Sequence, residues 1–174
     1  GVEIKIVDEA FEKINFEERV DLVGITAQTP VAPRAYQIAE GFKKRGIPVV
    51  MGGVHASMLP EEALQHVDAV VIGEAEEVWP DLIDDLKRGQ MRRIYVGSEF
   101  VNSSNLPLPR RDLLNEKFYV PLKLFETTRG CPHRCDFCGV SRFFGFRYRN
   151  RPISEIDREL KALFPEGSGM SPIP

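Results

Sequence analysis

The sequence has few cysteines and no long apolar run. Its 174 residues include 3 Cys, all between positions 131 and 138, and an odd number in one short stretch does not make a disulfide framework. No run of about 18 apolar residues occurs, and residues 1–5 lack the basic flank and apolar core of a signal peptide. These absences argue against a disulfide-rich secreted domain and a membrane span, and they predict a cytoplasmic protein.

The overall charge gives no reason to expect a nucleic-acid partner. The chain has 23 Lys and Arg against 26 Asp and Glu, a net charge of -3, and its 43% hydrophobic content is that of a globular protein. Residues 129–151 are locally basic, however, with Asp136 as the only acid. A field of this kind could attract an anionic ligand. Its arginines are Arg129, Arg134, Arg142, Arg147, Arg149 and Arg151.

The first hundred residues alternate short apolar runs with helical patterns, which is typical of βα units around a parallel sheet. We expect strands over 2–7, 21–26, 48–51 and 69–72, the last three covered on both faces. Ala35, Ile38, Ala39 and Phe42 recur at helical spacing, so the crossover between the second and third strands is helical. Further helices are expected over 59–66 and 78–86.

The remaining chain divides into a linker and a second unit. Ser, Asn and Pro are frequent over 97–109, which suggests a linker. A strand over 123–128, a cysteine-rich loop and an amphipathic helix carrying Ile153, Ile156, Leu160 and Leu163 follow, and 167–174 is expected to fray. We therefore expect a first domain over 1–97, a linker over 98–122 and a second unit over 123–174.

Three cysteines form a Cys-x3-Cys-x2-Cys pattern directly after the expected strand: Cys131, Cys135 and Cys138. Thiolates are soft ligands that suit iron or zinc. On a four-iron four-sulfur cluster, three protein ligands leave one iron free to bind a small molecule, which is a catalytic arrangement. A zinc site completed by His133 is the alternative, although zinc knuckles usually pair two cysteines with a distant second pair.

The cysteine motif resembles that of the radical S-adenosylmethionine (SAM) superfamily, which has an aromatic residue where Phe137 stands here. The resemblance implies a [4Fe-4S] cluster held by the three cysteines. It also implies reductive cleavage of bound SAM to a 5′-deoxyadenosyl radical, with Phe137 near the cofactors. An electron donor such as flavodoxin or ferredoxin and a small-molecule substrate would be the partners. Residues 139–156 also look like the matching stretch of radical enzymes that have an N-terminal cobalamin domain.

The first half resembles cobalamin-binding domains over 23–29, 51–55 and 72–76, which follow or end the expected strands. Ligands of open parallel sheets bind at this carboxyl edge. The resemblance implies that Thr26, Gly52, Gly53 and Gly73 face the cobalamin tail, with His55 and Glu74 at the rim. A Gly-Gly pair also suits any tight βα turn. The Asp-x-His-x-x-Gly motif that supplies a cobalt ligand in some of these domains is absent.

Together these features predict an α/β chain: a doubly wound, Rossmann-like (flavodoxin-like) parallel sheet lacking its first βα unit, followed by the first βα unit of a radical SAM (β/α) barrel. Such a chain looks like a fragment, inactive alone, of an enzyme for cobalamin-linked methylation or rearrangement of an organic substrate. Two alternatives remain at this point. One is a tRNA methylthiotransferase-like RNA modification enzyme, and the other is a non-catalytic zinc-binding or regulatory Rossmann-like module.

Overall fold

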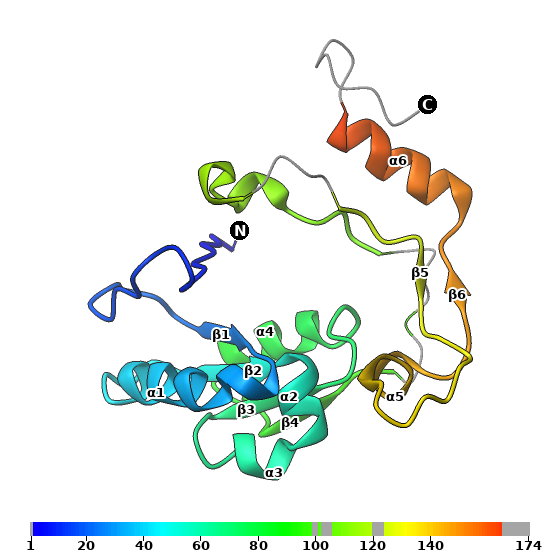
Figure 1. The fold of residues 1–174 in the computed structure, drawn as a ribbon. Helices are drawn as coiled ribbons and strands as arrows, with labels where there is room; N and C mark the ends of the chain where they lie inside the picture. The colour runs from blue at the N-terminus through cyan, green and yellow to red at the C-terminus, as the bar shows by residue number, and fades with distance from the viewer. Residues whose placement is uncertain (1, 99–100, 102–105, 120–123, 165–174) are drawn as a thin grey trace.

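The computed structural model describes residues 2–98, 101, 106–119 and 124–164. Its main element is a parallel sheet of four strands in the order β1 (Val23–Thr26), β2 (Val49–Gly52), β3 (Ala69–Ile72) and β4 (Ile94–Val96) (Figure 1). Helices connect them: α1 (Ala32–Lys43), preceded by the short helix η1 (Thr29–Val31), then α2 (Gly53–Met58), α3 (Pro60–Ala63) and α4 (Trp79–Lys87). The predicted α/β class and helical crossover are confirmed.

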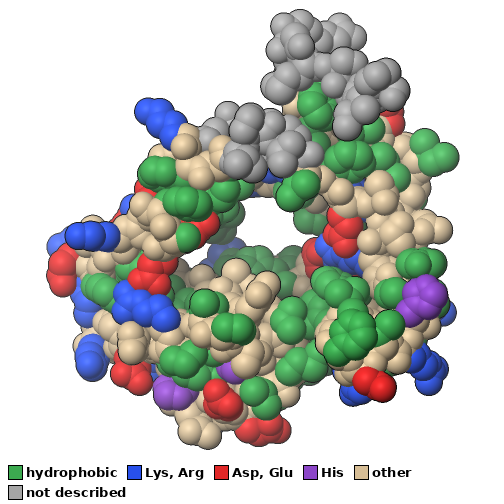
Figure 2. Space-filling model, in the orientation of Figure 1, with side chains coloured by type: hydrophobic (Ala, Val, Ile, Leu, Met, Phe, Trp, Pro, Cys, Tyr) green, Lys and Arg blue, Asp and Glu red, His purple; other side chains and the backbone are tan. Residues whose placement is uncertain are grey.

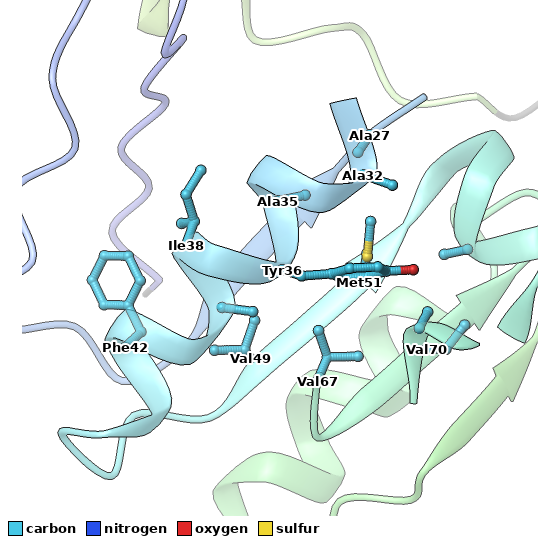
Figure 3. Close-up of a cluster of buried hydrophobic side chains, with 13 residues drawn as sticks. Ala27, Ala32, Ala35, Tyr36, Ile38, Phe42, Val49, Met51, Val67 and Val70 are labelled. Carbon is cyan, nitrogen blue, oxygen red and sulfur yellow. The ribbon is translucent and has the colours of Figure 1, made fainter. Parts of the chain in front are cut away.

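The central strands β2 and β3 are buried on both faces because they carry apolar residues at nearly every position. Val49 and Met51 of β2 face one way, against α1 and the chain around α2 and α3 (Figure 3). Val50, between them, packs with Leu82 of α4 and Tyr95 of β4. Successive side chains of a strand point to opposite faces, so a continuous apolar run requires helices on both sides. The core of the doubly wound domain therefore lies in two layers.

The expected strand over 2–7 is wrong. The segment is extended but belongs to neither sheet, and its apolar side chains at Val2, Ile4 and Ile6 are 62%, 52% and 42% exposed. Within the described part of the chain no strand pairs with the outer edge of β1. Gly24 and Thr26 of β1 are exposed, so this strand is not covered on both faces as expected. A β-branched run becomes a strand only when a neighbour completes its hydrogen bonds.

No sequence pattern predicted β4, which has only three residues. Its middle residue, Tyr95, is 1% exposed, and the hydroxyl donates to Asp85 Oδ2 (3.1 Å) while accepting from Arg92 N (2.9 Å). Ile94 and Val96 are exposed. A strand that buries one side chain is too short to produce a recognisable period.

The second unit is built around a small antiparallel sheet. Its strands, β5 (Thr128–Arg129) and β6 (Arg149–Asn150), flank the cysteines and helix α5 (Gly139–Phe144), and α6 (Ile153–Leu163) follows. Of the strand expected over 123–128, only Thr128 lies in a strand, as the first residue of β5: position 123 lies outside the described residues, and 124–127 are irregular. A strand therefore does precede the cysteines, but it begins later and is shorter than expected, and it pairs antiparallel with β6. The expected frayed end, 167–174, lies outside the described residues.

The segment between the two units carries two short helices, η3 (Arg111–Leu113) and η4 (Glu116–Phe118). Figure 2 shows an opening through the middle of the molecule, between the four-stranded domain and the chain above it. Parts of the expected linker, 99–100, 102–105 and 120–122, lie outside the described residues. No helix in the described ranges combines the length and apolar character needed to cross a membrane.

Candidate functional site

The cysteine loop, residues 130–138, leaves β5 through Gly130 and enters α5 at Gly139. Gly130 has φ +81°, and a Cβ there would lie 2.2 Å from the carbonyl oxygen of Arg147, so only glycine fits. The amide of Cys131 donates to the carbonyl of Gly145 (3.2 Å). One end of the loop is therefore fastened to the chain that returns from α5.

The three cysteines are free thiols. Cys135 is exposed, Cys131 and Cys138 are half-buried, and the amide of Cys138 donates to the carbonyl of Cys135 (3.1 Å). Among the described residues no three His, Cys, Asp or Glu side chains are already gathered for a metal ion. The donor set nevertheless fits an iron–sulfur cluster, because three soft thiolates occupy one accessible loop. Phe137 is 92% exposed.

The predicted glycines and Thr26 come together at the carboxyl edge of the sheet. Thr26 and Gly52 are paired positions at the ends of β1 and β2, and Gly73 directly follows β3. A Cβ on Gly73 would meet nothing within 4 Å, and one on Gly52 would touch only Val71, at 3.8 Å or more. The edge is thus open above Gly52 and Gly73, as a binding edge of an α/β sheet must be.

Gly53 is required by the turn itself. Its φ is +87°, and a Cβ would lie 2.5 Å from Thr26 Oγ1 and 3.5 Å from the carbonyl oxygen of Ala27. The amide of His55 also donates to Ala27 O (3.3 Å), which holds the start of α2 against the end of β1. The positive φ and the close approach to the Thr26 hydroxyl explain this glycine without any ligand.

The predicted place of His55 at the rim is wrong, because His55 is 1% exposed. Its Nε2 lies 2.6 Å from the hydroxyl of Tyr36, and its Nδ1 lies 3.2 Å from Thr29 Oγ1. Tyr36 donates to Glu62 Oε1 (3.0 Å). Burial and this hydrogen bond raise the pKa of Tyr36 to about 12. The apolar helix position of Tyr36 gave no sign of this polar network.

Glu74 is also not a free rim residue: it is 6% exposed and ion-paired with two arginines of the second unit. Arg129 Nη1 lies 2.6 Å from Glu74 Oε2, and Arg149 pairs with both carboxylate oxygens. Arg129 also reaches Glu76 (2.7 Å) and Glu126 (3.0 Å). Burial lowers the pKa of Arg129, but the hydrogen bonds that it donates to these three carboxylates outweigh this effect, so the pKa is raised.

A second buried ion cluster fixes α6. Glu159 is 1% exposed and pairs with Arg151 and, at 2.6 Å, with Arg111 of η3. Arg151 also donates to the carbonyl of Glu126 (2.7 Å). The positive field predicted over 129–151 is therefore offset at Arg129, Arg149 and Arg151 by carboxylates from elsewhere in the chain. That excess of arginine was the one sequence signal that buried acidic partners were needed.

Two family models match the chain. The B12 binding domain model matches residues 1–83, and the Radical SAM superfamily model matches residues 125–170. The chain belongs to the radical SAM superfamily, whose members are enzymes, and carries a B12-binding domain ahead of its radical SAM domain. These domains imply cobalamin, a [4Fe-4S] cluster and SAM as cofactors. The methylthiotransferase and zinc-module alternatives are not favoured.

Several of the relatives are methyltransferases. Bacteriochlorophyllide d C-8(2)-methyltransferase of Chlorobaculum tepidum is 40% identical over 84% of this chain and 34% of that protein. The C-12(1)-methyltransferase of the same organism is 36% identical over 82% of this chain and 32% of that protein. The radical SAM methyltransferase TsrM from Kitasatospora setae, solved with cobalamin and a [4Fe-4S] cluster, shares the fold (TM-score 0.58, 19% identity, 85% of this chain, 36% of that chain). This chain spans about a third of the length of the curated relatives.

Proposed function

We propose that this chain is the cofactor-binding part of an enzyme that transfers a methyl group to a small organic substrate through cobalamin and SAM. One observation carries the proposal: the loop with the three thiols is held next to the carboxyl edge of a B12-binding sheet by ion pairs from Glu74. The fold thus supports two cofactor sites as neighbours. Methyl transfer is favoured over rearrangement because the most similar relatives reported above are methyltransferases.

In this proposal Cys131, Cys135 and Cys138 hold the cluster, which leaves one iron for SAM. When bound, a reduced cluster supplies the electron that cleaves SAM, and cobalamin supplies a methyl carrier. The exposed ring of Phe137 lies within the loop and is available to cover the cofactors. Thr26, Gly52 and Gly73 border the cobalamin tail, where the lack of side chains on the glycines leaves room for it. An external electron donor such as flavodoxin or ferredoxin would be the partner that reduces the cluster.

The proposal is tested by loading the chain with both cofactors. After anaerobic incubation with iron and sulfide, about four irons and four sulfides per chain should remain bound, with a spectrum that changes when SAM is added. Hydroxocobalamin should bind, and Gly52→Val should weaken it, because the added side chain enters the open edge. Zinc at one equivalent without iron or sulfide would contradict the cluster. Equal cobalamin affinity in Gly52→Val would contradict the proposed edge.

A further inference from the structure

The Glu74 carboxylate is buried between two guanidinium groups from a distant part of the chain. Only 5% of its side chain is exposed, against 15% for Arg129 and 9% for Arg149. The two arginines are paired positions on β5 and β6, so the small sheet places both on the same carboxylate. We call Glu74, Arg129 and Arg149 the arginine–glutamate clamp.

The clamp is tied to the backbone on both sides. Arg149 donates to the carbonyl oxygens of Val101 (3.1 Å) and Phe144 (3.0 Å), the latter being the last residue of α5. On the other side, a Cβ on Gly97 would lie 2.1 Å from the carbonyl oxygen of Glu74, so the chain after β4 presses directly on the Glu74 backbone. Neither the carboxylate nor its partners can shift without moving several segments.

A purely stabilising role explains this arrangement poorly. Removing two or three charges from water costs free energy that their attraction only partly returns, so a buried ion cluster adds little net stability, whereas the loss of one member is strongly destabilising. What such a cluster does provide is a fixed geometry, because planar guanidinium groups bind a carboxylate in few orientations. The clamp should therefore matter for where the two units lie.

The position of the clamp shows which geometry it fixes. Glu74 follows Gly73 at the open sheet edge, and Arg129 is separated from Cys131 by Gly130 alone. We propose that Glu74 is a positioning residue that sets the cysteine loop at a defined distance from the sheet edge, acting through Arg129 and Arg149. The consequence of this positioning for catalysis rests on the proposed function, in which the same distance is the one between the cluster and cobalamin.

The geometric part is tested without cofactors, by amide hydrogen exchange of the chain. Glu74→Gln keeps the shape and removes the charge, and exchange should rise roughly tenfold or more over 126–150 and 95–98 while β1 to β3 stay protected. Glu76→Gln is the matched control: it removes one partner of Arg129 and leaves Arg149 on Glu74, so its effect should be clearly smaller. Unchanged exchange in Glu74→Gln, or equal effects in the two variants, would overturn the clamp.

If Glu74→Gln loses protection throughout the sheet, Arg149→Lys decides, because it keeps the charge and removes the two-pronged contact. Local loss of protection over 126–150 supports the clamp, and wild-type exchange there overturns it.

The catalytic consequence has its own readout, the magnetic coupling between cob(II)alamin and the reduced cluster. This coupling should have one value in the wild type, and it should be weaker or spread over several values in Arg149→Lys at equal cofactor content. Identical coupling would overturn that consequence. Failure of the wild type to load the cofactors would contradict the proposed function and leave the exchange test decisive for the clamp.

Discussion

Gly53 approaches Thr26 so closely that a Cβ on Gly53 would lie 2.5 Å from Thr26 Oγ1. The adjacent Gly52 has no such contact, although both glycines belong to the same turn. The fold therefore requires glycine at position 53, whereas a side chain at position 52 would conflict only with a bound ligand.

Gly53→Ala should destabilise the chain by about 1–3 kcal/mol whether or not cobalamin is present, because the position has a positive φ and no room for a side chain. Gly52→Ala, at φ -133°, should leave the free energy of unfolding within about 0.5 kcal/mol of the wild type. Chemical denaturation of both variants checks this. Equal losses at the two positions would show that the turn tolerates no Cβ anywhere.

Cys135→Ala should abolish cluster binding and leave the fold intact, since Cys135 is exposed. The measurement is iron and sulfide content after anaerobic reconstitution, with far-ultraviolet circular dichroism as the check on folding. Asp136→Ala, the neighbouring exposed position, is the control and should load normally. Full iron content in Cys135→Ala would remove this residue from the ligand set.

Glu159→Gln should cost roughly 3 kcal/mol at neutral pH, because it leaves buried arginine charge without its carboxylate. Burial raises the pKa of Glu159, but hydrogen bonds from Arg151 and Arg111 outweigh it, so the folded pKa lies below the ordinary value. The contribution of the Glu159 carboxylate to the free energy of unfolding is therefore fully present above the unfolded pKa of about 4.3, and it is lost as pH falls through the folded pKa.

Denaturation of wild type and Glu159→Gln from pH 7 to pH 2 measures this, and the difference should shrink at the acid end. Asp157→Asn is the control, because its ion pair with Lys161 (2.7 Å) is exposed and should contribute less than about 1 kcal/mol. A difference between wild type and Glu159→Gln that does not change with pH would contradict the assignment.

Tyr36 should make the chain less stable as pH rises from about 10 to about 12. The pKa of Tyr36 in the folded chain is about 12, above the ordinary tyrosine value of about 10, so the folded state retains a proton that the unfolded state has lost. The stabilising effect of the Tyr36 hydroxyl is complete below the unfolded pKa of about 10 and disappears as the pH rises toward the folded pKa of about 12. Tyr36→Phe should show a smaller loss of stability over this range, and an identical pH dependence would contradict the prediction.

Local patterns predicted the parts of the fold that depend on neighbours in sequence. The helical spacing of Ala35, Ile38, Ala39 and Phe42 corresponds to four buried residues of α1. The run Ala69–Ile72 is β3, residue for residue. The three cysteines share one loop because their spacing leaves no alternative. These features are confirmed because each is decided within about ten residues of chain.

The rest depends on contacts that no local pattern contains. Glu74 and Arg149 are 75 residues apart, and neither position has a period or motif that would assign it to the interior. The sequence placed Glu74 at a rim because it follows a strand; the pair with Arg149 buries it. The strand predicted over Val2–Val7 is wrong for the opposite reason, because this segment has a good β pattern but no strand partner in the described chain. Tertiary partners override propensity in both cases.

The hydrogen bond from Cys131 to Gly145 makes the chain between them a closed ring. Closing a flexible ring of this size costs on the order of 2 kcal/mol in chain entropy, which an open loop would have to supply when the thiolates gather around iron. In this chain the fold itself joins the two ends through that hydrogen bond. Binding of the cluster then has to order only the residues between Cys131 and Gly145. The binding equilibrium is more favourable because less chain entropy is lost.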